Sequence, residues 1–228
     1  MIASQFRLVV FDWDGTLMDS TAHITRSIQL ACQDLGLPIP SRERASHVIG
    51  LGLVDALQHA CPELKPTQYA EMVAAYRHHY LARDTEVALF DGVEAALAHY
   101  QQQPDIFLAV ATGKSRMGLD RVLNSTGLDR VFHATRTVDE CQSKPHPQML
   151  LELMAYFAVD ATETVMIGDT THDLLMAQHA NTHSIGIASG AHPADALQQT
   201  QPLACFSSFV ECDQWLRPRL SGSAAATI

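Results

Sequence analysis

Two acidic residues follow directly after the first apolar run of the chain. In the stretch VVFDWDGTLMDS, residues 9–20, Asp12 and Asp14 come immediately after Leu8–Phe11, and Asp19 follows. Burying a carboxylate costs free energy unless a cation or a proton compensates its charge. A surface turn is the alternative, since Asp is common in turns. The position of the two acids, at the end of an apparently buried run, favours a cation site over a turn.

Polar residues also follow three later apolar runs. They are Thr112-Gly113-Lys114-Ser115, the single Lys144, and Gly168-Asp169-Thr170-Thr171-His172-Asp173. In a parallel α/β sheet, ligands bind outside the carboxyl ends of the strands. If the apolar runs are parallel strands, these carboxylates, hydroxyls and ammonium groups therefore meet at one edge of the sheet.

This set of groups suits the transfer of a phosphoryl group with the help of magnesium. Mg²⁺ prefers hard oxygen ligands in near-octahedral geometry, and Asp12 and Asp169 can supply them. Phosphate oxygens need donors, which the Thr112 hydroxyl, the Gly113 amide and the Lys144 ammonium can provide. The sequence therefore indicates a Mg²⁺ cofactor and an anionic phosphate ligand at the same edge.

Short apolar runs alternate with helical patterns along most of the chain. The expected strands are Arg7–Phe11, Ile106–Ala111, Val131–Ala134, Thr164–Ile167 and Ser184–Ala188, with Leu203–Phe206 as a possible sixth. The expected helices between them are Arg116–Thr126, Gln148–Phe157 and His172–Ala180. This alternation predicts an α/β fold, a Rossmann-like parallel sheet core with helices on both faces.

The segment from Ser20 to about Arg83 has helical patterns only. One helix is indicated by apolar residues at helical spacing, with Asp19 or Ser20 placed to cap it: Ile24, Ile28, Ala31 and Leu35. Two further helices are expected at Leu53–Ala60 and Thr67–Arg83. We therefore predict a discontinuous α/β core, residues 1–18 and 84–228, interrupted by an inserted helical cap domain, residues 19–83.

Composition and charge exclude several classes of protein. With 228 residues, 47% hydrophobic and 18% charged, the chain can bury a core and is unlike disordered segments. Its formal net charge of −10 disfavours binding to nucleic acid or to an anionic membrane.

No apolar stretch approaches the ~20 residues of a membrane helix. The first residues lack the pattern of a signal peptide. Its 5 dispersed cysteines, without a CxxC pair, favour free thiols. We expect a cytoplasmic protein.

The motifs resemble those of the haloacid-dehalogenase-like hydrolase superfamily. DWDGTLMDS resembles its first motif, ATGKS its second, Lys144 its third and GDTTHD its fourth, all in the family's order. The insert lies where one subgroup of the superfamily carries a helical cap. Within that subgroup the chain most resembles phosphoglycolate-phosphatase-like members.

The resemblance implies catalytic roles for three residues. Asp12 would be the nucleophile that forms an aspartyl-phosphate. Asp14 would protonate the leaving oxygen and then accept a proton from the attacking water, while its backbone carbonyl binds Mg²⁺. Lys144 would neutralise the charge of Asp12 and of the phosphoryl group.

It also implies binding roles for four residues. Thr112 and Gly113 would hold the transferring phosphoryl oxygens. Asp169 would bind Mg²⁺ directly, alongside Asp12 and Asp14. Asp173 would be a further ligand or would support the site from behind, and a role in stabilising a helix N-terminus is a separate alternative.

The expected function is hydrolysis of a small phosphorylated metabolite, a phosphate monoester, through the aspartyl-phosphate. A phosphomutase and a non-catalytic protein that binds phosphate esters are the alternatives. Asp14 disfavours a dehalogenase, which has no leaving oxygen to protonate, and the lack of an arginine in IGLGLVDAL disfavours a mutase. Phosphoglycolate, sugar phosphates and nucleotides remain possible substrates, and the oligomeric state is left open.

Several residues of the insert could contribute to substrate selection. The polar candidates for facing a pocket are Arg26, Arg42, Arg44, His47 and His78, whose orientation is left open. For Arg42 or Arg44, a position in solvent is favoured over one in the pocket. Gly50–Gly52 is expected to be a hinge or a point where the backbone approaches the substrate.

Overall fold

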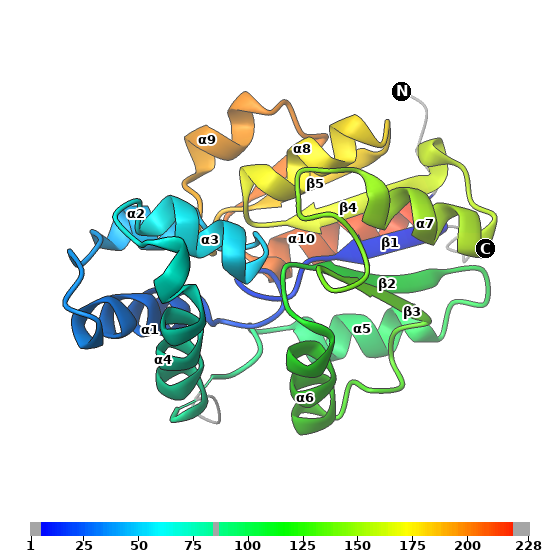
Figure 1. The fold of residues 1–228 in the computed structure, drawn as a ribbon. Helices are drawn as coiled ribbons and strands as arrows, with labels where there is room; N and C mark the ends of the chain where they lie inside the picture. The colour runs from blue at the N-terminus through cyan, green and yellow to red at the C-terminus, as the bar shows by residue number, and fades with distance from the viewer. Residues whose placement is uncertain (1–5, 84–86, 221–228) are drawn as a thin grey trace, which may run out of the picture.

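The sheet has six parallel strands in one layer. The structure, a computed structural model, describes residues 6–83 and 87–220. The strands are β1 (Leu8–Phe11), β2 (Phe107–Thr112), β3 (Ala134–Thr137), β4 (Thr164–Gly168), β5 (His183–Ile187) and β6 (Ala204–Phe206), in the order β3-β2-β1-β4-β5-β6 (Figure 1). All five pairings are parallel, which confirms the predicted α/β fold with a parallel sheet.

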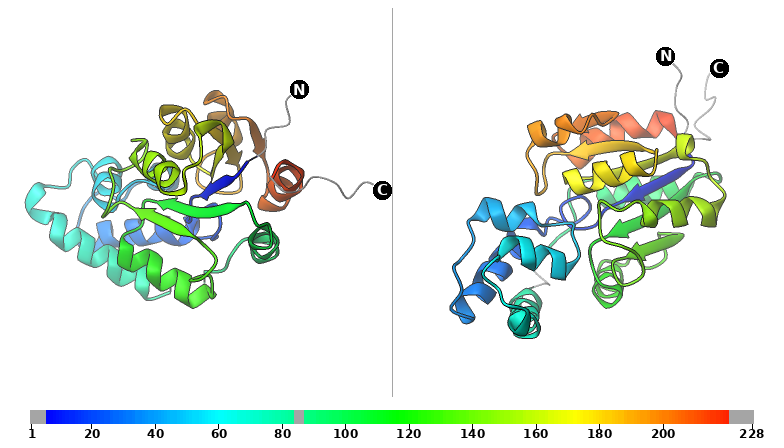
Figure 2. Two further views of the ribbon diagram at one scale, coloured as in Figure 1. Left: turned by 90° about the vertical axis from the view of Figure 1, so that its right-hand side faces the viewer. Right: turned by 45° about the horizontal axis from the view of Figure 1, so that its top comes forward.

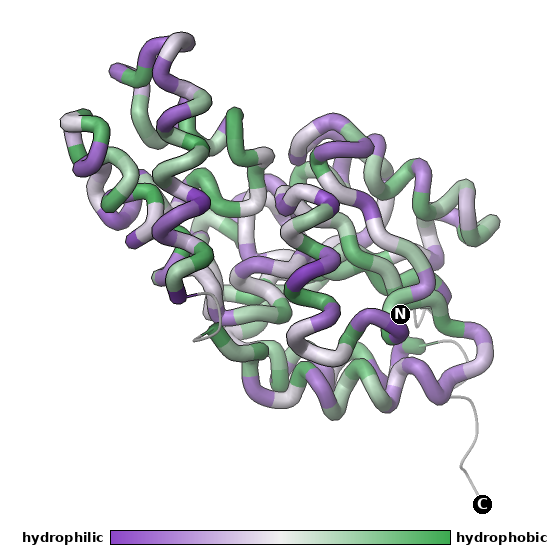
Figure 3. The backbone as a smooth tube through the Cα atoms, turned by 60° about the horizontal axis from the view of Figure 1, so that its bottom comes forward, coloured by the Kyte–Doolittle hydropathy of each residue, from purple (hydrophilic) through white to green (hydrophobic). Residues whose placement is uncertain are grey.

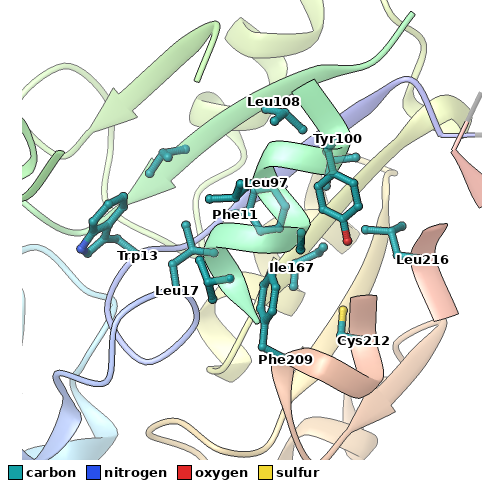
Figure 4. Close-up of a cluster of buried hydrophobic side chains, with 14 of the residues drawn as sticks. Phe11, Trp13, Leu17, Leu97, Tyr100, Leu108, Ile167, Phe209, Cys212 and Leu216 are labelled. Atoms are coloured by element: carbon teal, nitrogen blue, oxygen red, sulfur yellow. The ribbon is translucent and has the colours of Figure 1, made fainter. Parts of the chain in front are cut away.

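Helices cover both faces of this sheet, as predicted (Figure 2). Side chains of β1 alternate between two hydrophobic clusters, with Val9 and Phe11 in one and Leu8 and Val10 in the other. The first cluster also receives side chains from α5 (Val93–Gln101), α6 (Arg116–Thr126) and α10 (Phe209–Leu216). The second receives them from α7 (Gln148–Phe157) and α8 (Thr171–His179). Figure 4 shows the first cluster, where Phe11 packs among Leu97, Ile167 and Phe209.

Four helices form a layer of their own beside the carboxyl edge of the sheet, and we call them the insert. They are α1 (Thr21–Asp34), α2 (Arg42–His47), α3 (Leu53–Ala60) and α4 (Tyr69–Leu81) (Figure 1). A short turn of 3₁₀ helix at Pro66–Gln68 comes directly before α4. A separate hydrophobic cluster holds them together, including Ile28, Leu57 and Met72. Apolar and polar residues alternate along these helices in Figure 3. The predicted domain boundary, where the cap ends at residue 83 and the core resumes at residue 84, stays a prediction. Residues 84–86 lie outside the described residues.

The predicted strand Val131–Ala134 is wrong by three residues. The chain pairs with β2 only from Ala134 to Thr137, whereas Val131 and Phe132 lie before the strand and pack against the first cluster. The Phe132 ring lies 6.3 Å from the ring of Trp13. Because β3 is an edge strand, its residues need not be apolar, and the apolar signal came from the preceding loop.

Other elements differ less from expectation. Helices α3, α6 and α7 have the predicted bounds, whereas α2, α5, α10 and α9 (Ala194–Gln199) had not been predicted. Ser20 is the N-cap residue of α1, but its side chain makes no capping hydrogen bond, because it donates to Asp14 instead. None of the helices in the described parts of the chain is long and apolar enough to cross a membrane.

Candidate active site

The ends of the central strands bring the predicted site residues to one edge of the sheet. The register pairs Phe11 of β1 with Ile167 of β4, so that Asp12 and Asp169 follow neighbouring strand ends. Thr112 ends β2 on the other side of β1. Lys144 comes from the loop after β3, and Asp173 from the first turn of α8.

Lys144 lies between two carboxylates. Its Nζ is 2.9 Å from Asp12 Oδ1 and 2.6 Å from Asp173 Oδ1, and all three side chains are buried. Burial alone would lower the pKa of Lys144, but the two carboxylates outweigh it and raise the pKa. The lysine is therefore a fixed positive charge at the centre of the site.

Lys144 alone does not compensate the charge of Asp12 or give both of its oxygens a partner. Its Oδ1 accepts a hydrogen bond of 2.7 Å from the Trp13 N–H and faces Lys144. Within the described residues, its Oδ2 is buried and has no hydrogen-bond partner. Burial raises the pKa of Asp12 to about 7 in spite of Lys144. The negative charge of this buried carboxylate is therefore not fully compensated, and a bound cation would compensate it.

Asp169 completes a cluster of carboxylates that fits such a cation. Oxygen atoms of Asp12, Asp169 and Asp173 lie within 4.8 Å of one another. Asp169 is oriented by hydrogen bonds from Thr16 Oγ1 at 2.8 Å and from the Ala191 N–H at 2.7 Å. Burial, followed by the charges of the other two acids, raises its pKa well above the ordinary value. Clustered hard oxygens with one unpartnered atom match the ligands that Mg²⁺ prefers.

Asp173 also stabilises the start of α8. Its Oδ2 accepts hydrogen bonds from the Thr170 N–H at 3.1 Å and from Thr170 Oγ1 at 2.7 Å, while Thr170 caps the helix in return. The structure thus confirms the helix-capping alternative, whereas the role of Asp173 at a metal site stays a prediction. It caps a helix with one oxygen and faces Lys144 with the other.

Asp14 is paired with a lysine that had not been predicted as a site residue. Lys114 Nζ lies 2.9 Å from Asp14 Oδ2, and Ser20 Oγ donates to Asp14 Oδ1 at 2.7 Å. The same Nζ donates to Tyr80 Oη of α4 at 3.1 Å. Burial would lower the pKa of Lys114, but Asp14 and Tyr80 raise it. The motif ATGKS contains this lysine, and its position directly after Thr112 and Gly113 was the available signal.

The insert approaches the predicted phosphate-binding residues through its backbone. A Cβ atom added to Gly113 would lie 2.5 Å from the carbonyl oxygens of Gly50 and Leu51. The Gly52 N–H donates to Ser143 Oγ at 3.0 Å, which connects the same segment to the loop before Lys144. Gly50 has a φ of +91°, which favours glycine. The segment 50–52 therefore lies directly over Gly113.

We expect Gly113→Ala to lower kcat/KM on the protein's substrate by ~10–100-fold, because overpacking at a rigid contact costs about 1–3 kcal/mol. The added methyl group would push Gly50 and Leu51 away from the edge of the sheet. Steady-state kinetics measure the change. Gly52→Ala is the matched control, since its added Cβ meets neighbours only at 3.5 Å. Equal kinetics for Gly113→Ala and Gly52→Ala would contradict the close contact.

The polar insert residues proposed from sequence do not line the cavity beside Asp14. Arg26, Arg42, Arg44 and His78 are exposed and absent from its lining, which instead includes Arg77 of α4 and Arg121 of α6. The His47 ring stacks on His192 with 4.5 Å between centroids, and His47 is also absent from the lining. The exposure of Arg42 and Arg44 agrees with the favoured prediction for them, although Arg42 also lines a second pocket beside Gly190 and Ala191. Helical periodicity places apolar residues but does not orient the polar ones.

Comparison with known proteins identifies a family. The family model described as haloacid dehalogenase-like hydrolase matches residues 9–187. A protein of Dickeya dadantii named probable phosphatase IndB is 35% identical over 90% of this chain and 90% of its own length. A phosphoglycolate phosphatase of Aliivibrio fischeri is 30% identical over 86% of this chain and 90% of its own. The crystal structure of a predicted phosphoglycolate phosphatase from Haemophilus somnus superposes with a TM-score of 0.82 at 25% identity, covering 92% of this chain and 98% of that one.

Proposed function

The chain belongs to the haloacid dehalogenase-like hydrolase family, and we propose that it is a Mg²⁺-dependent phosphatase that hydrolyses a small phosphate monoester through an aspartyl-phosphate. The names of the similar proteins, which are phosphatases, support hydrolysis rather than mutase activity. The observation that carries the proposal is the buried, unpartnered Oδ2 of Asp12 beside Lys144 and the other carboxylates.

In this proposal Asp12 forms a bond to phosphorus and the bond from phosphorus to the substrate alcohol breaks. Lys144, 2.9 Å from Asp12, orients the nucleophile and neutralises the charge of the phosphoryl group. Thr112 and Gly113, at the end of β2, hold phosphoryl oxygens. Asp12, Asp169 and the backbone carbonyl of Asp14 would hold Mg²⁺, with Asp173 as a further ligand or support. The ion would supply the positive charge that the cluster of acids lacks.

Asp14 handles the proton in both halves of the reaction. It gives a proton to the leaving oxygen in the first half. It then takes one from the water that attacks phosphorus, which releases inorganic phosphate and restores Asp12. The contacts with Lys114 and Ser20 hold Asp14 as an ionised carboxylate, the form that accepts the proton in the second half. The insert would act as a cap, residues 19–83, that excludes bulk water from the edge of the sheet.

A phosphate-release assay with purified protein and Mg²⁺ tests the proposal. The panel contains phosphoglycolate, sugar phosphates, nucleotides and an aryl phosphate. Release from at least one ester supports phosphatase activity. Conversion between isomeric sugar phosphates without phosphate release would indicate the mutase. No reaction with any compound would leave the non-catalytic binding protein.

A cytoplasmic location is part of the same proposal and is supported by five free cysteines.

Removal of metal should stop the reaction reversibly. We expect chelation to abolish phosphate release and added Mg²⁺ to restore it, because Asp12 then lacks compensating charge. Mg²⁺ at 100 times its Kd should also stabilise the folded state by about 2.7 kcal/mol. Thermal unfolding with and without Mg²⁺ measures this directly. Asp169→Asn should lose the shift in Tm. Full turnover in chelator would exclude a metal role for the cluster.

A further inference from the structure

A cavity of about 290 Å³ lies beside Asp14, between the insert and the core. Its walls come from α1, α3, α4 and the segment 48–51 on the insert side, and from Gly113 and α6 on the core side. Helices α4 and α6 flank it and lie next to each other in Figures 1 and 2. Its size is near the lower end of the range of about 300–1,000 Å³ for pockets that hold drug-sized ligands.

Most of the lining is apolar. The apolar and aromatic residues are Ile24, Ile28, Val48, Ile49, Leu51, Leu53, Ala56, Tyr76, Tyr80, Leu81 and Met117. A small charged molecule would remove little of this apolar surface from water, so the lining favours a larger apolar ligand that covers it. The Tyr76 ring, 5.8 Å from that of Tyr80, adds an aromatic surface to this lining against which a ring could pack. The Tyr80 ring is already contacted by His23, Lys114 and Arg121.

The charged groups of the lining are mainly positive. Asp14 is paired with Lys114, and Arg77 and Arg121 add two further cations. Lys114 Nζ and the Arg121 guanidinium lie 5.1 Å and 5.8 Å from the centre of the Tyr80 ring. This charge pattern disfavours a cationic amine on the ligand.

We propose that this cavity receives the leaving group of the substrate, and that the leaving group is a bulky, mainly apolar alcohol that carries a ring. The inference rests on the proposed function, in which Asp14 protonates the leaving oxygen. Since Asp14 lines the cavity, an alcohol whose oxygen reaches Asp14 places its body among the apolar walls. A two-carbon acid such as glycolate would leave those walls in contact with water. The proposed ring-bearing substrate thus differs from phosphoglycolate, although some relatives of the chain are named phosphoglycolate phosphatase.

Phosphate monoesters of four primary alcohols test this inference. The assay compares kcat/KM for phenethyl phosphate, ethyl phosphate, phosphoglycolate and ethanolamine phosphate with Mg²⁺. One methylene in an apolar pocket changes specificity by ~10–200-fold, so we expect phenethyl phosphate to exceed ethyl phosphate and phosphoglycolate by at least ~100-fold. Ethanolamine phosphate should be the poorest substrate of the four.

Two variants connect the preference to the cavity. Met117 is 71% exposed at the edge of the cavity, so Met117→Gln should fold normally. Ile24→Thr changes a buried wall residue of α1. Each should lower the ratio of kcat/KM between phenethyl and ethyl phosphate by ~5-fold or more, a change approaching that for one methylene in an apolar pocket. Ile39→Thr, at an exposed position of the insert outside the cavity, should leave the ratio unchanged.

The outcomes separate this inference from the proposed function. No release from any ester would overturn the proposed function itself. Release with phosphoglycolate or ethyl phosphate as good as phenethyl phosphate would overturn the leaving-group inference and leave the phosphatase intact. A preference for phenethyl phosphate that neither Met117→Gln nor Ile24→Thr reduces would also overturn it, because the ring would then bind elsewhere.

Discussion

Asp12→Asn is expected to abolish phosphate release, with a loss on the order of 10⁴-fold or more in kcat, the size of effect found when a nucleophile is removed. An amide cannot form the bond to phosphorus, although it keeps the shape of the side chain. Its oxygen can still accept the hydrogen bond from the Trp13 N–H, and Lys144 retains Asp173. Rapid-quench or long-time phosphate assays measure the residual rate.

The same variant should fold at least as stably as the wild type when metal is absent. Burial raises the pKa of Asp12 to about 7, so the carboxylate is held there at a cost that the neutral amide does not have. Thermal unfolding in chelator checks this. Asp19→Asn is the matched control, because Asp19 is an exposed acid of the same motif and its variant should keep full activity. Hydrolysis retained in Asp12→Asn would remove Asp12 from the role of nucleophile.

Lys144→Met is expected to damage both activity and folding. The substitution leaves the carboxylates of Asp12 and Asp173 buried without the lysine that lies 2.9 Å and 2.6 Å from them. Breaking a buried ion pair in this way costs about 3–5 kcal/mol of unfolding free energy. Urea unfolding measures that loss, and kcat should fall by ~10³-fold or more because a charge that stabilises the transition state is removed.

Two comparisons make the Lys144 result specific. Lys65→Met changes an exposed lysine and should alter stability by no more than about 0.5 kcal/mol. Combining Lys144→Met with Asp12→Asn removes one of the two uncompensated charges, so the double variant should be more stable than Lys144→Met alone, with a coupling of about 0.5–3 kcal/mol. A loss below about 1 kcal/mol in Lys144→Met, with no coupling, would contradict the central role given to this lysine.

The sequence by itself determined the family and the chemistry of the edge of the sheet. Asp12, Thr112 and Asp169 could be placed because each follows an apolar run, and parallel strands all deliver their carboxyl ends to one side. The bounds of α6 and α7 were correct for a similar reason. Their amphipathic periodicity is a local property that a single sequence carries.

Features that depend on packing could not be derived in this way. The edge strand β3 has no apolar run of its own, so the signal pointed to the loop before it. The pairing of Asp14 with Lys114 joins residues 100 positions apart, and neither residue type nor spacing shows that the two side chains turn toward each other.

Only the tertiary structure decided how the insert meets the core. The contact of the segment 50–52 with Gly113 and the apolar cavity beside Asp14 both arise where two layers from distant parts of the chain pack together. Local sequence patterns report which side of a helix is apolar, but not which surface covers it. The residues proposed for the reaction therefore lie at the ends of the strands, where the sequence places them. The cavity proposed to select the substrate depends instead on the packing of the insert against the core.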